Sequence, residues 1–256
     1  MERILIYQDN GQWYQSADFT YQWLKSQLGN IYKIEFTNAK DILENRVLNK
    51  TNVVALFITG GHSRFYFQSL GYQGVKLIQD FIASGRHYFG ICGGAYFASN
   101  SIRFKGDTLE LNSEQTLKLV NINTYGSIRE ICKGNLFSNC IYSSKAVKVN
   151  TPSINECYVY YWGGPCFINH PEKSVLGYYT EHNLPALLQS FYGAGTCNLI
   201  SFHPEYNSKS FARLIKQNKS KPLHCSYLRK LSRKLKLSEV TGDKLELDKL
   251  ILKPLL

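Results

Sequence analysis

Apolar and polar positions along the first hundred residues follow two different periods. Short apolar runs, each suited to one buried strand, alternate with segments in which apolar residues recur every three or four positions, as on one face of a helix. This order predicts a parallel sheet flanked by helices. The strands are expected near residues 4–7, 32–36 and 53–58 and directly before Cys92.

Two amphipathic helices are predicted between these strands. Ser16 is placed to cap the first and Gly29 to end it. The second leads to Gly85. Their apolar faces consist of Phe19, Trp23, Leu24 and Leu28 in the first helix and Val75, Leu77, Ile78 and Phe81 in the second.

Between residues 102 and 201 the pattern changes to short alternating runs, which are typical of strands. Predicted strands are residues 146–149, 157–161, 175–179 and 186–192. The glycines at 193 and 195 then turn the last of these into a hairpin with residues 196–202. The sequence therefore predicts an α/β sandwich with β-rich additions.

Cys92 ends the fourth apolar run and is surrounded by glycines, in the order Gly90-Ile91-Cys92-Gly93-Gly94. Small neighbours of this kind allow a strained turn from strand to helix that exposes a nucleophile, the nucleophile elbow. A cysteine at the N-terminal end of a helix lies in a field that favours thiolate over thiol. Cys92 is thus a candidate nucleophile. The alternative is a buried thiol that packs as a small apolar residue.

A second candidate group lies at His203-Pro204-Glu205, where another apolar run ends. A nucleophilic cysteine needs a general base and benefits from a third group that orients the imidazole. Pro204 restricts His203 to extended backbone, which places residues two apart on one side of the chain. His203 and Glu205 are therefore predicted to complete a Cys-His-Glu triad with Cys92.

Together these segments resemble the class I glutamine amidotransferase-like superfamily, whose Cys, His and Glu occur in the same order. A further match is the strand and glycine pair of residues 54–61, which end in Gly60-Gly61. The resemblance implies a flavodoxin-like α/β sandwich with a mostly parallel central sheet. It also implies that the N–H groups of Gly93 and of Gly60 or Gly61 form an oxyanion hole.

Three segments resemble, more specifically, the N-terminal domain of eukaryotic-type biotin–protein ligases and its stand-alone bacterial relatives. They are residues 90–97, 161–167 and 201–205, and the resemblance covers about residues 1–206. Two differences limit what it implies. Tyr96 occupies the position where glutamine amidotransferases have Gln, which makes glutamine a doubtful substrate. The biotin and adenylate loop of a ligase is missing, and a biotin ligase activity is not expected of this chain.

Further residues are candidates for substrate binding. Asp9 follows the first strand, at an edge where parallel sheets bind ligands, although Asp-Asn-Gly is also ordinary turn sequence. His62 follows the glycine pair and either lines the pocket or ends a loop. Tyr96 follows the elbow. Tyr161, Gly163 and Gly164 belong to a glycine-rich segment that either approaches the pocket or forms a bulge.

The spacing of Cys157, Cys166 and His170 is not that of metal ligands, and neither a metal nor another cofactor is expected.

Positive charge is concentrated at the end of the chain. Residues 206–256 hold 13 Lys and Arg against four Asp and Glu, a net charge of +9 out of the total of +11. A basic helix is predicted there, with an apolar stripe of Tyr227, Leu228, Leu231 and Leu235. Such a helix can bind nucleic acid or an anionic membrane. The favoured interpretation is that the stripe of this tail, residues 207–256, packs on the preceding domain, residues 1–206.

The remaining composition bears on location and partners. Seven cysteines form no disulfide pattern, the apolar run at residues 4–7 is shorter than that expected of a signal peptide, and no later stretch reaches membrane-spanning length. These features predict a cytoplasmic protein.

A small-molecule substrate is expected, and a protein partner is a further candidate. The sequence thus favours a cysteine-dependent acyl transferase or C–N hydrolase. The alternative is a regulatory or ligand-binding module without turnover, and a nucleic-acid binder rests on charge alone.

Overall fold

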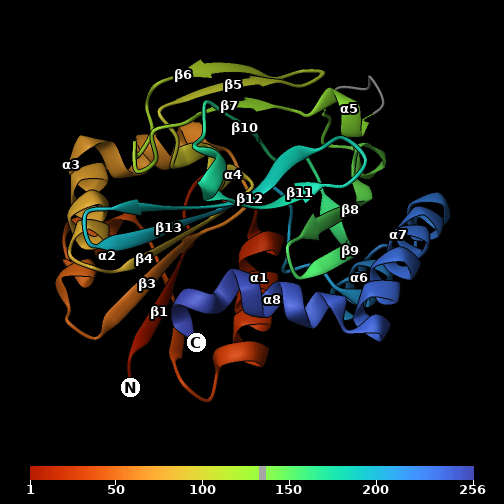
Figure 1. Cartoon of the computed structure of the whole chain (residues 1–256), viewed down its shortest axis with the longest axis horizontal. Coiled ribbons are helices and arrows are strands. Elements are labelled where there is room, and N and C mark those ends of the chain that lie inside the picture. The colour runs from red at the N-terminus through yellow and green to blue at the C-terminus, as the bar shows by residue number, and fades with distance from the viewer. Residues whose placement is uncertain (133–136) are drawn as a thin grey trace.

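A sheet of nine strands forms the central layer of the computed structural model, which describes residues 1–132 and 137–256 (Figure 1). Five neighbouring strands are parallel, in the spatial order β2 (Lys33–Thr37), β1 (Arg3–Tyr7), β3 (Val53–Ile58), β4 (His87–Ile91) and β13 (Gly195–Ile200). The sheet continues in antiparallel pairing through β12 (Leu184–Tyr192), β11 (Val175–Tyr179), β8 (Lys145–Thr151) and β9 (Ile154–Tyr161). The predicted α/β fold is confirmed, with a sheet that is parallel in one half and antiparallel in the other.

Strand β1 shows how the sheet separates two cores. Successive side chains of a strand point to opposite faces. Ile4 and Ile6 accordingly join the core formed with α1 (Tyr14–Leu28), whereas Leu5 and Tyr7 join the core formed with α3 (Ser63–Ala83). All six residues of β3 are buried, as expected of a strand covered on both faces.

Helix boundaries differ from the sequence prediction at two points. Helix α1 begins at Tyr14, with Trp13 at the N-cap position and no side-chain cap, so the prediction that Ser16 caps it is wrong. The Trp13 N–H donates to Gly60 O at 2.9 Å, which starts the helix earlier and turns Ser16 into the protein interior. Helix α3 begins well before Val75 and is interrupted at Gly71, whose φ is +57°.

A smaller second sheet lies beside the elbow end of the central sheet. Its order is β10 (Cys166–Ile168), β7 (Asn123–Gly126), β5 (Ser101–Lys105) and β6 (Glu110–Ser113). Short connecting helices are α2 (Ala39–Leu43), α4 (Gly93–Phe97) and α5 (Arg129–Cys132), with 3₁₀ turns η1 (Val47–Asn49), η2 (Ile141–Ser143), η3 (Glu172–Ser174) and η4 (Lys253–Leu255). The four strands that the alternating pattern predicts are instead β8, β9, β11 and β12 of the central sheet.

Three helices complete the chain: α6 (Ser208–Gln217), α7 (Pro222–Thr241) and α8 (Asp243–Leu252). The apolar stripe of α7 is buried, since Leu228, Leu231 and Leu235 pack in a cluster that also contains Tyr160 and Tyr206. In α8 the apolar residues Leu247, Ile251 and Leu252 join the main core beside α1. The basic tail therefore covers one end of the molecule with an apolar inner face.

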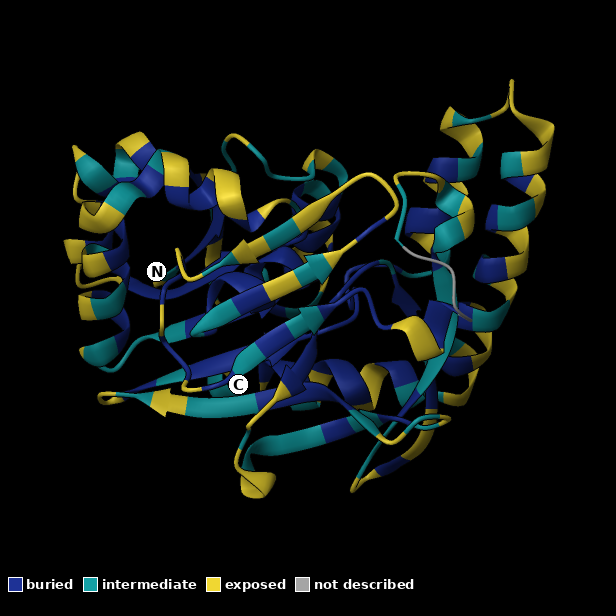
Figure 2. Ribbon diagram, turned by 90° about the horizontal axis from the view of Figure 1, so that it is seen from above, coloured by how far each residue is buried: buried dark blue, intermediate teal, exposed yellow. Residues whose placement is uncertain are grey.

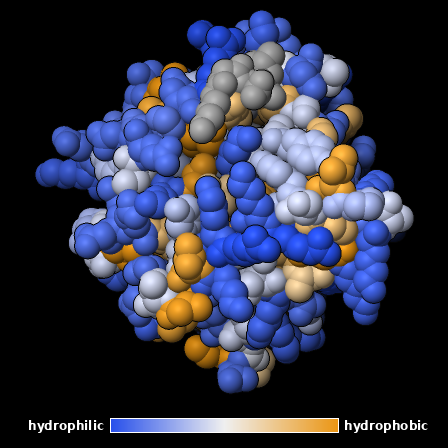
Figure 3. Space-filling model, turned by 90° about the vertical axis from the view of Figure 1, so that its right-hand side faces the viewer, coloured by the Kyte–Doolittle hydropathy of each residue, from blue (hydrophilic) through white to orange (hydrophobic). Residues whose placement is uncertain are grey.

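The burial of each residue depends on the layer in which it lies (Figure 2). Buried residues concentrate in the central strands, and exposed residues lie on the outer faces of the helices. The face that carries α7 is mainly hydrophilic, with hydrophobic atoms in separate small patches (Figure 3). Among the described residues, no helix combines the length and hydropathy needed to cross a membrane.

Candidate active site

The elbow places Cys92 at the carboxyl end of β4 with φ +49° and ψ −102°. Its glycine neighbours make this turn sterically accessible. A Cβ on Gly94 would lie 1.8 Å from Ile58 O, and one on Gly90 would lie 2.7 Å from the Gly94 carbonyl. The Cys92 N–H donates to Ile200 O at 2.8 Å, which fixes the elbow to β13. Helix α4 has only five residues, so its field on the sulfur is weaker than that of a long helix.

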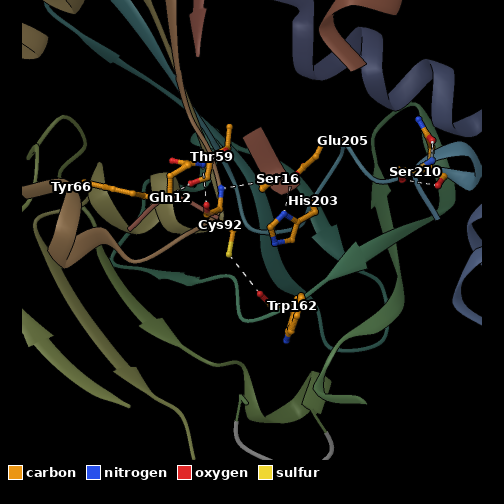
Figure 4. A network of polar contacts seen from close by, with 11 residues as sticks. Gln12, Ser16, Thr59, Tyr66, Cys92, Trp162, His203, Glu205 and Ser210 are labelled. Carbon is orange, nitrogen blue, oxygen red and sulfur yellow. Dashed lines mark hydrogen bonds and ion pairs between the residues drawn. The ribbon is translucent and has the colours of Figure 1, made fainter. Parts of the chain in front are cut away.

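The thiol of Cys92 is close to fully enclosed but reaches a cavity. The residue is 8% exposed, and its Sγ lies 3.6 Å from Trp162 O. The ring of His203 lies beside the sulfur (Figure 4). The two candidate groups, 111 positions apart in sequence, thus meet where β4 and β13 end side by side.

His203 and Glu205 form a buried pair behind the thiol. His203 Nδ1 and Glu205 Oε1 are 2.7 Å apart, and neither side chain is exposed. The backbone N–H of His203 donates to Tyr160 O at 2.8 Å, which sets the position of the loop after β13. Because Nδ1 faces Glu205, Nε2 is the nitrogen left to act on the thiol. This Nε2 has no hydrogen-bond partner among the described residues.

The electrostatics of the pair favour a charged imidazole. Burial on its own lowers the pKa of His203, but the negative charges of Glu205 and Cys92 and the hydrogen bond to Glu205 outweigh burial and raise that pKa to about 10. The site is therefore set up to hold a proton on His203 next to the sulfur. That arrangement suits a group that must later donate a proton to a leaving group.

Ser16 is a member of this network that sequence reasoning missed. Its hydroxyl donates to Glu205 Oε1 at 2.6 Å and accepts the N–H of Gly60 at 3.1 Å. Glu205 Oε1 is thus held from two sides, by Ser16 and by His203. No local signal identifies Ser16, because the contact depends on how α1 packs against the loop after β13.

The contact with Ser16 also revises the predicted oxyanion hole. The Gly60 N–H is directed to Ser16 and is not available to a substrate oxygen. The N–H groups of Gly61 and Gly93 have no partner among the described residues. Their backbones are in close contact, since a Cβ on Gly93 would lie 2.8 Å from Gly61 N. Gly61 and Gly93 are therefore the pair that fits an oxyanion hole.

The loop that carries Gly61 is held by residues that follow β1. Gln12 Nε2 donates to Gly60 O at 3.0 Å and also bonds to the Thr59 hydroxyl. The His62 N–H donates to Gly11 O at 2.9 Å. Gln12 and Ser16 thus position the glycine loop and the carboxylate from the same end of α1 (Figure 4).

A partly enclosed cavity of about 500 Å³ opens over Cys92. Of the predicted binding residues, His62, Tyr96 and Gly163 line it. The Tyr96 hydroxyl donates to Gly163 O at 3.1 Å, so its polar atom already has a partner. The second sheet contributes a wall through Phe104 and Leu111, which the sequence did not place near the site.

Asp9, Tyr161 and Gly164 lie outside this cavity, contrary to the prediction that they bind substrate. Asp9 accepts the N–H groups of Asn10 at 2.7 Å and Ala39 at 2.8 Å, which is turn chemistry. The fully buried Tyr161 bonds through its hydroxyl to Gly164 O at 3.0 Å. A Cβ on Gly164 would lie 1.6 Å from Ser201 O, so this glycine permits close backbone packing.

Within residues 1–132 and 137–256, no three His, Cys, Asp or Glu side chains converge as metal ligands would.

Comparison with known proteins gives a family match over most of the chain. The model of the family described as "Biotin-protein ligase, N terminal" matches residues 2–248. This match extends past residue 206 and includes α6, α7 and part of α8. A biotin–protein ligase of Schizosaccharomyces pombe is 26% identical over 243 residues, which are 89% of this chain and 37% of that protein. An uncharacterized protein of Chlamydia muridarum is 31% identical over 106 residues, 41% of this chain and 40% of that one.

The matched segments thus span 37% and 40% of the lengths of these two curated relatives. Among solved structures, a glutamine amidotransferase of Thermotoga maritima superposes with a TM-score of 0.57 and 15% identity, covering 99% of this chain and 97% of that one. Another glutamine amidotransferase has a TM-score of 0.55 and 17% identity, covering 90% and 98%. At this level of identity the likeness establishes the fold.

Proposed function

This chain belongs to the biotin-protein ligase N-terminal family, and from that premise and the geometry around Cys92 we propose that it is a cysteine-dependent acyl transferase or C–N hydrolase. Its substrate is a small amide or carbonyl compound. The observation that carries the proposal is the buried His203–Glu205 pair, whose unpartnered Nε2 is directed to the Cys92 thiol at an elbow.

In the first half of the proposed reaction, the Cys92 thiolate attacks the substrate carbonyl carbon and a C–S bond forms. The carbonyl oxygen becomes an oxyanion that accepts the N–H groups of Gly61 and Gly93. One such donor contributes about 3 kcal/mol in measured enzymes. The C–N bond then breaks, and the leaving nitrogen takes the proton from His203 Nε2. An acyl-thioester on Cys92 and a free amine result.

In the second half, water attacks the thioester carbonyl while His203 Nε2 accepts its proton. The C–S bond breaks, and Cys92 leaves as the thiolate that began the cycle. The net change is amide plus water to carboxylic acid plus amine. If an amine or alcohol replaces water, the same steps transfer the acyl group.

Glu205 and Ser16 are positioning residues in this scheme. Glu205 fixes the tautomer of His203 by holding Nδ1 and stabilises the imidazolium that the cycle uses. Ser16 in turn holds Glu205 Oε1. An intact, buried network of this kind favours turnover over a purely regulatory role, because an unneeded buried ion pair destabilises a fold unless it is fully hydrogen-bonded.

An acyl-enzyme assay tests the proposal. We expect wild-type protein treated with p-nitrophenyl acetate to gain one acetyl group on Cys92, detected by intact mass and peptide mapping. The Cys92→Ala variant should gain none. The His203→Ala variant should acylate at least about tenfold more slowly, because less of Cys92 is present as thiolate without the imidazolium. Cys140→Ser is the matched control, because it removes an exposed thiol and leaves Cys92 in place. Equal acetylation of wild type and Cys92→Ala would contradict the proposal.

A further inference from the structure

The cavity over Cys92 has a wall of connected aromatic rings. Trp13 meets Trp162 edge to face at 4.6 Å between ring centroids, and Phe137 lies 6.2 Å from Trp162. Phe104 follows at 5.4 Å from Phe137, and Tyr96 at 5.9 Å from Phe104. These five rings all line the cavity. They come from distant parts of the chain, so only the fold assembles them.

The polar atoms of Trp162 and Tyr96 in this wall already form hydrogen bonds within the protein. Trp162 Nε1 donates to Ser143 Oγ at 2.8 Å and to Ser138 O at 3.1 Å. The Tyr96 hydroxyl donates to Gly163 O. What these rings offer a ligand is therefore mainly carbon surface. Ile102, Leu109 and Leu111 of the second sheet extend that surface.

Charge lies at the mouth of the cavity. Among the described lining residues the formally charged side chains are Arg64 and Glu110, and both are exposed. A free amino acid such as glutamine carries an ammonium and a carboxylate. Placing either group against the aromatic wall would remove it from water without a partner, which is strongly unfavourable.

From this wall we propose that the acyl group accepted by Cys92 is uncharged and largely apolar, an aryl or branched aliphatic acyl group. The inference rests on the proposed function and names its substrate class. A volume of about 500 Å³ is within the range of small-molecule sites, so a phenylacyl group fits beside the thiol. The leaving group is placed toward the charged mouth.

Binding is measured first, without turnover. Trp13 and Trp162 line the cavity, so tryptophan fluorescence of Cys92→Ala reports occupancy. We expect phenylacetamide to bind saturably and at least about tenfold more tightly than acetamide, the lower range for pocket discrimination of apolar groups. Glutamine should cause no saturable change. Equal affinity for phenylacetamide, acetamide and glutamine would overturn the inference.

Acylation of wild-type protein is measured second, with p-nitrophenyl phenylacetate, p-nitrophenyl acetate and mono-p-nitrophenyl succinate. The phenylacetate should acylate Cys92 fastest and the charged succinate slowest. Phe104→Ala should reduce the preference for phenylacetate over acetate at least about tenfold. Phe191→Ala, which changes an exposed ring outside the cavity, should leave that preference unchanged.

The two measurements separate the inference from the proposed function. If Cys92→Ala binds phenylacetamide selectively but wild type is acylated by no ester, the apolar pocket stands and the proposed reaction fails. If wild type is acylated on Cys92 equally fast by all three esters, the proposed reaction stands and the inference fails. Unchanged selectivity in a folded Phe104→Ala variant, checked by its melting temperature, also contradicts the inference.

Discussion

The Ser16 hydroxyl donates a 2.6 Å hydrogen bond to Glu205 Oε1, across 189 positions of sequence. This bond joins the first turn of α1 to the loop after the last parallel strand. Because the same hydroxyl accepts the Gly60 N–H, one side chain fixes both the carboxylate of the proposed triad and the loop that leads to Gly61. The orientation of His203 and the shape of the oxyanion hole are therefore coupled through Ser16.

Replacing Ser16 tests this coupling. Ser16→Ala removes a donor to a buried carboxylate and leaves the Gly60 N–H unpartnered, which costs about 1–3 kcal/mol per buried group. We expect unfolding free energy to fall by that order and Cys92 acylation to slow about tenfold or more. Ser26→Ala, in the same helix but with a hydroxyl that only bonds Trp23 O, is the control. A shift in the pH profile of acylation, absent from the control, distinguishes positioning of His203 from a loss of stability alone.

The raised pKa of His203 makes stability depend on pH. In an unfolded chain the pKa of the imidazole is about 6.5, whereas in the fold it is about 10. The folded state therefore binds the extra proton, and this contribution is complete below about pH 6.5 and is lost as pH rises toward 10. Urea denaturation of wild type between these limits should show stability falling with pH.

Glu205→Gln is the matched variant for that measurement. It keeps the shape of the side chain but removes the charge that raises the His203 pKa. The other ionisable side chains are the same in both proteins, so the difference between the two stability profiles isolates the His203–Glu205 pair. We expect the difference to be largest near pH 6.5 and to shrink toward pH 10. If the stability of the two proteins changed in parallel with pH across this range, His203 would not hold the extra proton in the folded state.

Sequence patterns predicted the parts of the site that depend on short segments. The glycines around Cys92 define a turn that few other sequences allow, and Pro204 fixes the local geometry of His203. Ser16 and the aromatic wall were not predicted, since they depend on tertiary packing between distant segments. Asp9 illustrates the opposite error: its place after β1 suggested ligand binding, but both of its oxygens accept backbone N–H groups.

The basic tail is predicted to stabilise the fold through its apolar stripe. Leu231 is 4% exposed in α7, and removing a buried leucine side chain costs about 2–5 kcal/mol. Leu231→Ala should therefore lower the melting temperature by several degrees, at about 2–4 °C per kcal/mol for a chain of this size. Leu237→Ala on the same helix, where the side chain is 58% exposed, should have little effect. Equal melting temperatures for the two variants would show that the stripe does not pack in solution.

Thiol reactivity separates chemistry from exposure at the proposed nucleophile. Cys140 is exposed, whereas Cys92 is 8% exposed, so exposure alone predicts faster alkylation of Cys140. An adjacent imidazolium stabilises thiolate, the reactive form. We therefore expect iodoacetamide at pH 7 to label Cys92 before Cys140 and the other five cysteines, as measured by peptide mass.

His203→Ala provides the decisive comparison for this prediction. Without the imidazole, Cys92 should label at least about tenfold more slowly, because less of it is present as thiolate, while Cys140 labels at its original rate. The order of labelling should then reverse. A variant in which both rates stay unchanged would place His203 outside the chemistry of the thiol. Since the same ring must donate the proton to the leaving nitrogen, that result would also remove the general acid from the proposed reaction.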